Sequence, residues 1–228
     1  MKSYISKVLG KFFNYRNEDI PSFLLHSLYH DGTYLPFTTS SLKFRSLACV
    51  CNDIVVNKRE EYLEFGSGLS TIIVARLIKK NKLKTKITSI EEDLGWINLL
   101  QKIVDEEGLN DFVKFIHAPT TKSESIENSF EYNPASIKEQ LPPAKKFDCV
   151  VIDGPAAWER HKLNSRVSNA AILEGRTASS CTIFIDNADR IGERKLVTIL
   201  SAELSLKPLF IDPTFAVLVQ GIHYNFII

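Results

Sequence analysis

Apolar and polar positions follow two alternating patterns along most of this chain. From residue 61 onward, short apolar runs of strand length are separated by longer stretches with apolar residues at helical spacing. The runs predict strands at residues 61–65, 86–90, 112–116, 147–152 and 181–185, and the stretches predict helices at 69–80, 93–107, 134–141, 162–175 and 191–203. Strands and helices in alternation are typical of a parallel sheet with right-handed crossovers, so the pattern predicts an α/β fold.

The two ends of the chain depart from this alternation. Apolar runs at Lys207–Ile211, Ala216–Val219 and Tyr224–Ile228 predict extended segments that have no helix between them. At the other end, a turn-rich segment at residues 31–40 leads into an amphipathic helix predicted at 42–55. We therefore expect an N-terminal helical extension over residues 1–58 and one α/β domain over residues 59–228.

The first residues have the spacing of an amphipathic helix. Ile5, Val8, Leu9 and Phe12 fall on one helical face and lysines lie elsewhere, which is compatible with a helix on a membrane surface. A helix of this kind more often packs on its own domain or on a second subunit. We favour packing, and we consider a homodimer formed through the N-terminal helices. Because no apolar run reaches the length of a membrane span, we predict no integral membrane association.

Composition and charge narrow the class of protein. The chain has 228 residues, of which 44% are hydrophobic and 24% charged, as is ordinary for a globular domain. A net charge of +1 predicts no nucleic-acid partner. The four cysteines, at positions 49, 51, 149 and 181, form no C-x-x-C pair. This favours a reducing compartment over a disulfide framework, so we expect a cytoplasmic location.

The segment Tyr62–Thr71 has the most informative pattern in the chain. A short apolar strand passes through a glycine turn and opens an apolar helix, whose first amides would face a ligand with the positive end of the helix dipole. NAD-binding turns have a third glycine where this chain has Thr71. Glu64, two places before the first glycine, suits a cationic, amine-bearing ligand better than a pyrophosphate.

This turn resembles motif I of the class I S-adenosylmethionine-dependent methyltransferases. The matching pattern is Glu64-x-Gly66-x-Gly68, and Ser70 stands in place of the last glycine, at the helix start where Ser caps well. The resemblance covers about residues 60–228. It implies a doubly wound, mostly parallel, seven-stranded Rossmann-like sheet with a terminal antiparallel hairpin, and S-adenosyl-L-methionine as the cofactor. The cofactor-binding residues that it implies are Glu64, Gly66, Ser67, Gly68, Ser70, Glu91, His117, Ala118 and Asp153.

Two further strand ends match the same family. Glu91 ends the second predicted strand about 25 residues after the turn, where an acidic side chain meets ribose hydroxyls in doubly wound folds. Glu91 also belongs to an acidic run that solvent alone would explain. His117 and Ala118 follow the third strand, beside the adenine in the family. A histidine there departs from the usual acidic or polar residue, so stacking, hydrogen bonding and a plain loop role all stay open.

Candidate chemistry lies after the fourth and fifth strands. The fourth strand ends in Asp153-Gly154-Pro155, and with a nearby Arg and an Ala-Ile-Leu helix it resembles a branch that includes glucuronoxylan O-methyltransferases. The resemblance implies O-methylation of a small-molecule or glycan hydroxyl. Asp153 is our first candidate for a general base and Asp186 the second. As the alternative, Asp153 forms the turn and caps a helix.

The sequence allows more than one function for two sets of polar residues near the fourth and fifth strands. Asp153, Asp186 and Asn187 resemble the Mg²⁺ ligands of catechol-type O-methyltransferases. Because the lysine base of that family is here Ala156, we favour a site without metal, and Mg²⁺ binding at these residues stays the open alternative. Either recognition of an acidic substrate or solvent exposure would explain the basic residues between the two strands. They are Arg160, His161 and Arg166.

Two other classes of function compete with methyl transfer. One is an oxidoreductase that binds NAD through the glycine turn, and the other is a non-catalytic methyltransferase-fold protein that binds a partner. The segment from Pro119 to Lys146 is long and polar, and it follows a strand end, so it is either a substrate lid or an insertion.

Overall fold

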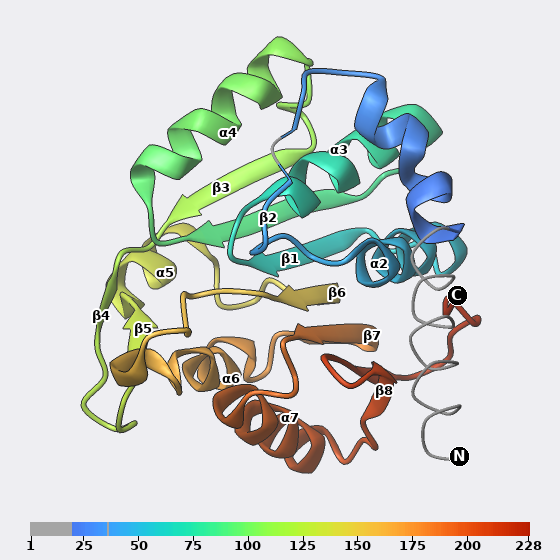
Figure 1. Ribbon diagram of the computed structural model, residues 1–228. Coiled ribbons are helices and arrows are strands. Elements are labelled where there is room, and N and C mark those ends of the chain that lie inside the picture. The colour runs from blue at the N-terminus through green and yellow to red at the C-terminus, as the bar shows by residue number, and fades with distance from the viewer. Residues whose placement is uncertain (1–19, 36) are drawn as a thin grey trace, which may run out of the picture.

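A seven-stranded sheet forms the centre of the computed structural model, which describes residues 20–35 and 37–228 (Figure 1). The strand order is β3-β2-β1-β6-β7-β9-β8. The first five of these strands are parallel, and β9 pairs antiparallel with both β7 and β8. The bounds are β1 Glu61–Phe65, β2 Lys86–Glu91, β3 Val113–His117, β6 Phe147–Ile152, β7 Thr177–Asp186, β8 Leu209–Asp212 and β9 Phe215–Gln220. The predicted Rossmann-like methyltransferase sheet with its terminal hairpin is confirmed.

Helices cover both faces of this sheet. One face carries α2, α3 and α4, and the other carries α5, α6 and α7 (Figure 1). Their bounds are α2 Phe44–Val56, α3 Leu69–Asn81, α4 Leu94–Glu106, α5 Pro134–Gln140, α6 Asn169–Leu173 and α7 Ile191–Leu204. Because the parallel strands are buried on both sides, they are apolar along their length rather than alternating, as the sequence pattern predicted.

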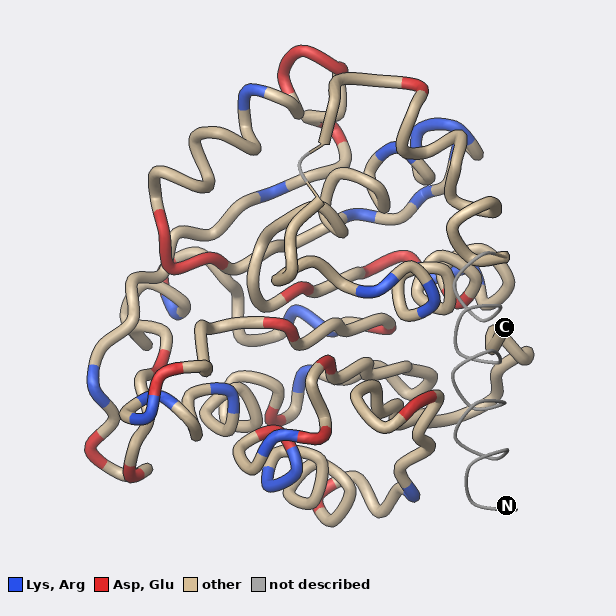
Figure 2. Tube along the Cα trace, viewed as in Figure 1, with Lys and Arg blue, Asp and Glu red and all other residues tan. Residues whose placement is uncertain are grey.

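The carboxyl ends of the central strands carry acidic residues. Glu64 lies near the end of β1, Glu91 and Asp186 end β2 and β7, and Asp153 follows β6 directly (Figure 2). These strands are neighbours in the sheet, and parallel strands end at the same edge. The fold therefore brings together carboxylates from four separate parts of the chain, at the edge where open α/β sheets bind their ligands.

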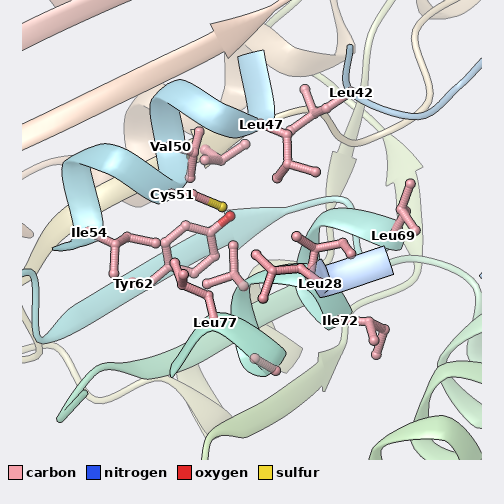
Figure 3. Packing of buried hydrophobic residues seen from close by; sticks show 14 of the residues in the cluster. Leu28, Leu42, Leu47, Val50, Cys51, Ile54, Tyr62, Leu69, Ile72 and Leu77 are labelled. Atoms are coloured by element: carbon pink, nitrogen blue, oxygen red, sulfur yellow. The ribbon is translucent and has the colours of Figure 1, made fainter. Parts of the chain in front are cut away.

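Strand β1 divides its side chains between the two layers. Tyr62 points toward α2 and α3, where its ring lies close to Cys51, Ile54 and Leu77 (Figure 3). Leu63, the next residue, packs in the opposite layer. This period of two fixes which residues of β1 face each helix layer. Full burial of side chains of this size stabilises the fold by about 2 kcal/mol each.

A buried arginine joins the N-terminal segment to the sheet domain. Residues 20–30 are helical, and the Arg76 guanidinium in α3 donates hydrogen bonds to the backbone oxygens of Leu28 and Tyr29 in the last turn of that helix and of Thr33 beyond it. Arg76 also pairs with Glu107 at the end of α4. The apolar residues of α2 share one core with the sheet. The domain division at residue 58 stays a prediction, and the amphipathic helix predicted for residues 5–12 lies outside the described residues.

No helix within residues 20–35 and 37–228 has the length and apolar character that crossing a membrane requires. The homodimer and the cytoplasmic location stay predictions.

The predicted helix at 162–175 is wrong. The chain forms two 3₁₀ turns there, η1 Arg160–Lys162 and η2 Ser165–Ser168, before the short α6. The Ser165 hydroxyl accepts a hydrogen bond from the Phe130 amide, and the Ser168 hydroxyl donates to the Ser165 carbonyl. Serine side chains that bond to the backbone compete with helix formation.

Three other segments differ from the predictions. The predicted loop from 119 to 146 contains a small antiparallel hairpin, β4 Thr120–Lys122 and β5 Phe130–Tyr132. Strand β7 begins four residues earlier than expected, at Thr177 rather than at residue 181. Residues 224–228 form no strand, although Phe226 is buried and contacts the Phe184 ring at 5.4 Å.

Candidate functional site

Two backbone turns cross at the carboxyl edge of β1 and β6. Gly66 has a φ of +88°, and a Cβ on it would lie 2.9 Å from the Gly154 nitrogen. A Cβ on Gly154 would lie 2.6 Å from the Gly66 Cα. Only glycine fits at either position, because any side chain would push the two turns apart. The glycine in Asp153-Gly154-Pro155 is thus explained by its close approach to the first glycine turn.

Gly68 has a different role from these two glycines. It precedes α3, and no atom lies within 4 Å of the position that its Cβ would occupy. The open space at this point is a cavity that Gly68 itself lines. A side chain at residue 68 would therefore project into the volume that a ligand needs, at the positive end of the α3 dipole.

Glu64 lies behind the glycine turn rather than in the cavity. Its carboxylate is fully buried and accepts hydrogen bonds from the hydroxyl groups of Tyr62, Ser70, Thr71 and Ser89. Burial raises the pKa of Glu64, and these hydroxyl donors lower it. Glu64 therefore supports the turn through hydroxyl groups. A direct contact between Glu64 and a ligand stays a prediction.

Glu91 supports the turn from the neighbouring strand. Its Oε2 accepts the Ser67 amide at 2.8 Å, and its Oε1 accepts the amides of Glu92 and Asp93. A carboxylate has about four acceptor positions, so one stays open on Oε2. Burial raises the pKa of Glu91, and the three amide donors oppose that rise. Glu91 also lines the larger cavity, and its contact with a ribose hydroxyl stays a prediction.

Two neighbouring cavities, of about 410 and 160 Å³, open along this edge. They share Ser40, Gly66, Ser67, Trp96 and Asp153. The larger one is also lined by Glu91, Glu92, Asp93, Tyr132, Gly154, Pro155, Ala156, Trp158 and Lys162. The smaller one is also lined by Thr38, Ser41, Leu42, Gly68, Leu69 and Ser70. Together they have the size of a small-molecule site.

Four of the predicted site residues, Glu64 among them, do not line these cavities. His117 and Ala118 follow β3, where Ala118 is fully buried and its amide donates to the Glu91 carbonyl. Asp186 is 6% exposed and lines neither cavity. The structure thus brings together Gly66, Ser67, Gly68, Ser70, Glu91 and Asp153 around one space, and leaves Glu64, His117, Ala118 and Asp186 outside its lining.

Arg166 fixes the backbone around Asp153. Its Nη2 donates to both the backbone oxygen and Oδ1 of Asp153, the latter at 3.0 Å. Nη1 donates to the Asp186 carbonyl at 3.2 Å and Nε to the Pro155 carbonyl at 3.3 Å. Glu193, from the first turn of α7, approaches Nε to 3.5 Å on the other side. One side chain therefore ties together the ends of β6 and β7 and the start of α7.

Comparison with known families identifies this arrangement. A family profile described as a methyltransferase domain matches residues 63–188, which is more than half of the chain. The chain belongs to this methyltransferase family. The resemblance to class I S-adenosylmethionine-dependent methyltransferases is thereby confirmed, and the narrower likeness to glucuronoxylan O-methyltransferases stays a prediction. The family also favours methyl transfer over the NAD-dependent alternative.

Solved structures show the same fold at low sequence identity. A protein of Klebsiella pneumoniae described as a candidate O-methyltransferase is 16% identical, with a TM-score of 0.57 and coverage of 90% of this chain and 91% of that one. The Bacillus cereus O-methyltransferase, crystallised with SAH, is 15% identical, with a TM-score of 0.56 and the same two coverages. The O-methyltransferase TomG of Streptomyces achromogenes, in complex with SAM, is 14% identical, with a TM-score of 0.52 and coverage of 90% and 91%. A comparison with curated protein sequences found no match.

Three carboxyl groups, those of Asp153, Asp186 and Glu193, lie beside the single guanidinium of Arg166 in this methyltransferase. Burial raises the pKa of Asp153 to about 6, although Arg166 opposes the rise. Burial also raises the pKa of Asp186 to about 7, and the negative charge of Asp153 raises it further. Both oxygens of Glu193 are buried and accept no hydrogen bond from the described residues. Perturbed carboxyl groups of this kind are common at functional sites.

The absence of a metal at this edge stays a prediction. Within residues 20–35 and 37–228, no three His, Cys, Asp or Glu side chains are grouped so that they could hold a metal ion. Asp153 is already paired with the Arg166 guanidinium, so a divalent ion there would be repelled. The Asn187 side chain donates its N–H to Asp186 Oδ2 at 2.6 Å, so it turns a donor rather than its oxygen toward that carboxylate.

The basic residues between β6 and α6 differ in their exposure and in their contacts. Arg166 is 4% exposed and is committed to the contacts described above. Arg160 is exposed, and His161 lies 3.5 Å from the Glu159 carboxylate. Lys162, which the sequence did not single out, lines the larger cavity with its ammonium over the Phe130 ring. Acidic-substrate recognition by Arg160 or His161 stays a prediction.

Sequence reasoning missed several residues that line the methyltransferase cavities. Trp96 donates its indole N–H to the Ser67 carbonyl at 2.8 Å and lines both cavities. Trp96 lies in the first turn of α4, a few residues after Glu91, and this position could have indicated from the sequence that it lines the site. No sequence signal places Tyr132, which comes from the hairpin, or Ser40, which comes from the N-terminal segment. Both reach the cavity only through the tertiary fold.

Proposed function

We propose that this chain is an S-adenosylmethionine-dependent methyltransferase that acts on a hydroxyl group of a small molecule or glycan. The observation that carries the proposal is the open position beside Gly68, which a Cβ would fill, at the start of α3 and next to Asp153. Because Gly68 has no side chain, a ligand in this cavity can contact the backbone directly. The cavity also has the size of a ligand site.

The residues that line the cavities could contact the ribose, the base and the amino-acid end of S-adenosylmethionine. The acceptor position left on Glu91 suits one ribose hydroxyl, and the Trp96 and Tyr132 rings supply apolar surface for a base. The turn at Gly66–Gly68 leaves room for the amino-acid end, supported from behind by Glu64. S-adenosylmethionine, when bound, supplies an electrophilic methyl group. The carboxylates that line or underlie the site favour a cationic ligand.

Asp153 is the residue that we assign to proton transfer. Its carboxyl lines both cavities, and a pKa of about 6 leaves it ionised at neutral pH yet basic enough to accept a proton. The acceptor hydroxyl would pass its proton to Asp153 as the oxygen attacks. Arg166 holds this carboxylate in one orientation through Oδ1. Asp186 lies one strand away and outside the cavity lining, so we assign it a supporting charge rather than contact with the substrate.

Calorimetric titration with S-adenosylhomocysteine tests donor binding without knowledge of the acceptor. We expect wild-type protein to bind it and Gly68→Val to bind it at least tenfold more weakly, because the valine side chain fills the cavity. Ala202→Val, on the exposed side of α7, is the matched control and keeps wild-type affinity. A thermal-shift comparison with NADH separates the methyltransferase from the oxidoreductase.

The non-catalytic alternative needs a separate measurement. A homocysteine-release assay over sugars, phenols and hydroxy acids measures turnover directly. We expect at least one hydroxyl compound to give turnover that Asp153→Asn abolishes. Binding of neither S-adenosylhomocysteine nor NADH would instead favour a protein that keeps the fold for partner binding.

A further inference from the structure

The Arg166 guanidinium lies in a hole lined by oxygen atoms. Four of them are acceptors of its hydrogen bonds: the carbonyl oxygens of Asp153, Pro155 and Asp186, and the Asp153 Oδ1. The fifth is Glu193 Oε1, 3.5 Å from Nε. Carbonyl and carboxylate oxygens in such numbers are the ligands that hard divalent cations take. In this chain an amino-acid side chain occupies the hole.

The walls of this hole are rigid. A Cβ on Gly192 would lie 1.9 Å from the Leu163 carbonyl oxygen, so the first turn of α7 packs directly on the segment that leads to Arg166. Lys195 donates to the Asn164 side chain across the same contact, at 3.1 Å. Glu193 is therefore held beside the guanidinium by the packing of α7, and it is fully buried.

The charges at this edge require a cation. Two buried carboxyl groups, those of Asp186 and Glu193, and the partly exposed carboxyl group of Asp153 lie beside one buried arginine. Arg190 contributes from farther away, with its Nη1 3.9 Å from Glu193. Without Arg166, the buried carboxylates would have no adjacent buried cation, which is strongly unfavourable.

We propose that the Arg166 guanidinium is the built-in cation of this site, and that it balances the charge and fixes the loops among residues that resemble the divalent-ion ligands of catechol-type O-methyltransferases. Arginine is ionised at all accessible pH values, and its planar fork fixes several oxygens at once. Methyl transfer by this chain then needs no divalent metal. This consequence rests on the proposed function, whereas the cation role of Arg166 itself does not.

Mn²⁺ binding, followed by electron paramagnetic resonance on the full-length protein, tests the proposal. Wild-type protein should bind no Mn²⁺ at Asp153, because Arg166 fills the hole. Arg166→Ala should gain a Mn²⁺ site at least tenfold tighter than any in the wild type, and Asp153→Asn in that background should remove it. Arg166→Lys, which keeps a positive charge, should gain none.

The matched control is Arg59→Ala. Arg59 is equally buried but faces a single carboxylate, that of Asp53, so its removal should create no Mn²⁺ site. The proposal is overturned if wild-type protein binds Mn²⁺ and Asp153→Asn abolishes that binding, or if Arg166→Ala folds and gains no site. Should Arg166→Ala fail to fold, wild-type protein with and without Asp153→Asn, together with Arg166→Lys, still decides. S-adenosylhomocysteine binding by the same samples separately tests the proposed function.

Discussion

Two buried arginines at opposite edges of the sheet differ in how completely their charge is matched. Arg59, just before β1, forms a two-pronged pair with Asp53 in α2, at 2.9 and 3.1 Å. It also donates to the hydroxyl groups of Ser180 and Thr182, and Asp53 accepts further bonds from Thr182 and Asn57. One guanidinium forms an ion pair with one carboxylate, and a second carboxylate, that of Asp148, interacts with Arg59 from farther away and accepts two backbone amides. This network holds α2 on the sheet.

The network around Arg166 is unbalanced by comparison. Three carboxyl groups share it, two of them with pKa values raised to about 6 and about 7, and the third, Glu193, accepts no hydrogen bond from the described residues. A buried carboxyl group that resists ionisation costs stability. At the other edge, burial also raises the pKa of Asp148, but the amides of Glu60 and Glu61 oppose that rise, and the Asp53 carboxylate accepts four hydrogen bonds. The imbalance therefore marks the functional end of the sheet.

The largest expected difference is in stability. Asp53→Ala leaves Arg59 buried without a counter-charge, so we expect it to lower the free energy of unfolding by about 3–5 kcal/mol. Asp153→Asn removes one of three competing carboxylates and should cost less than about 1 kcal/mol, since surplus negative charge is relieved. Urea denaturation measures both. Equal losses in the two variants would remove the contrast between the networks.

Turnover should respond strongly to Asp153→Asn, the variant for which we expect the smaller loss of stability. Asp153→Asn removes the proton acceptor while leaving the cavity shape, so we expect turnover to fall by about 10²-fold or more with little change in S-adenosylhomocysteine affinity. Because the wild-type carboxyl has a pKa of about 6, kcat/KM should rise with pH through that value and level off above it. Asp189→Asn, an exposed residue at the same edge, serves as the control. Wild-type turnover by Asp153→Asn would exclude Asp153 from proton transfer.

Asp186 should produce a smaller effect that depends on pH. Its pKa is raised in the folded state, so the folded protein holds a proton that the unfolded chain releases between about pH 4 and 7. Stability from this group is therefore full at low pH and lost as pH rises toward 7. Asp186→Asn should therefore raise the free energy of unfolding at pH 8 and leave it nearly unchanged at pH 4. A gain that is the same at both pH values would contradict this assignment.

The smallest expected effect is at Glu91. Glu91→Ala removes a ribose hydrogen bond and loosens the Ser67 amide, so S-adenosylhomocysteine should bind about 5- to 30-fold more weakly, equivalent to about 1–2 kcal/mol. Calorimetry measures the change, with Glu106→Ala on the exposed face of α4 as the control. An unchanged affinity would rule out contact between Glu91 and the ligand.

Much of the fold was predictable because the parallel strands are apolar on both faces. The pattern placed β1, β2, β3 and β6 within one residue of their observed bounds. The predicted helix at 162–175 failed because hydroxyl groups of Ser165 and Ser168 bond to the backbone, a competition that periodicity does not detect. The β4–β5 hairpin was missed because each of its strands has only three residues.

The candidate site was predictable where a residue follows a strand directly. Asp153 and Glu91 come at strand ends, and the parallel topology alone brings them to one edge. Glu64 shows the limit of this reasoning, because its carboxylate turns inward to four hydroxyl groups and not into the cavity. Arg166 shows a second limit, since a basic residue in a polar segment gives no sign of burial. Both depend on side-chain packing between distant segments.

A crystal structure of the protein with S-adenosylhomocysteine tests the central claim most directly. The account predicts the ligand in the joined cavities, with its amino-acid end beside Gly68, a ribose hydroxyl within hydrogen-bonding distance of Glu91 and its sulfur facing the Asp153 side of the site. A ligand bound elsewhere, or cavities that stay closed in protein saturated with it, would contradict the account.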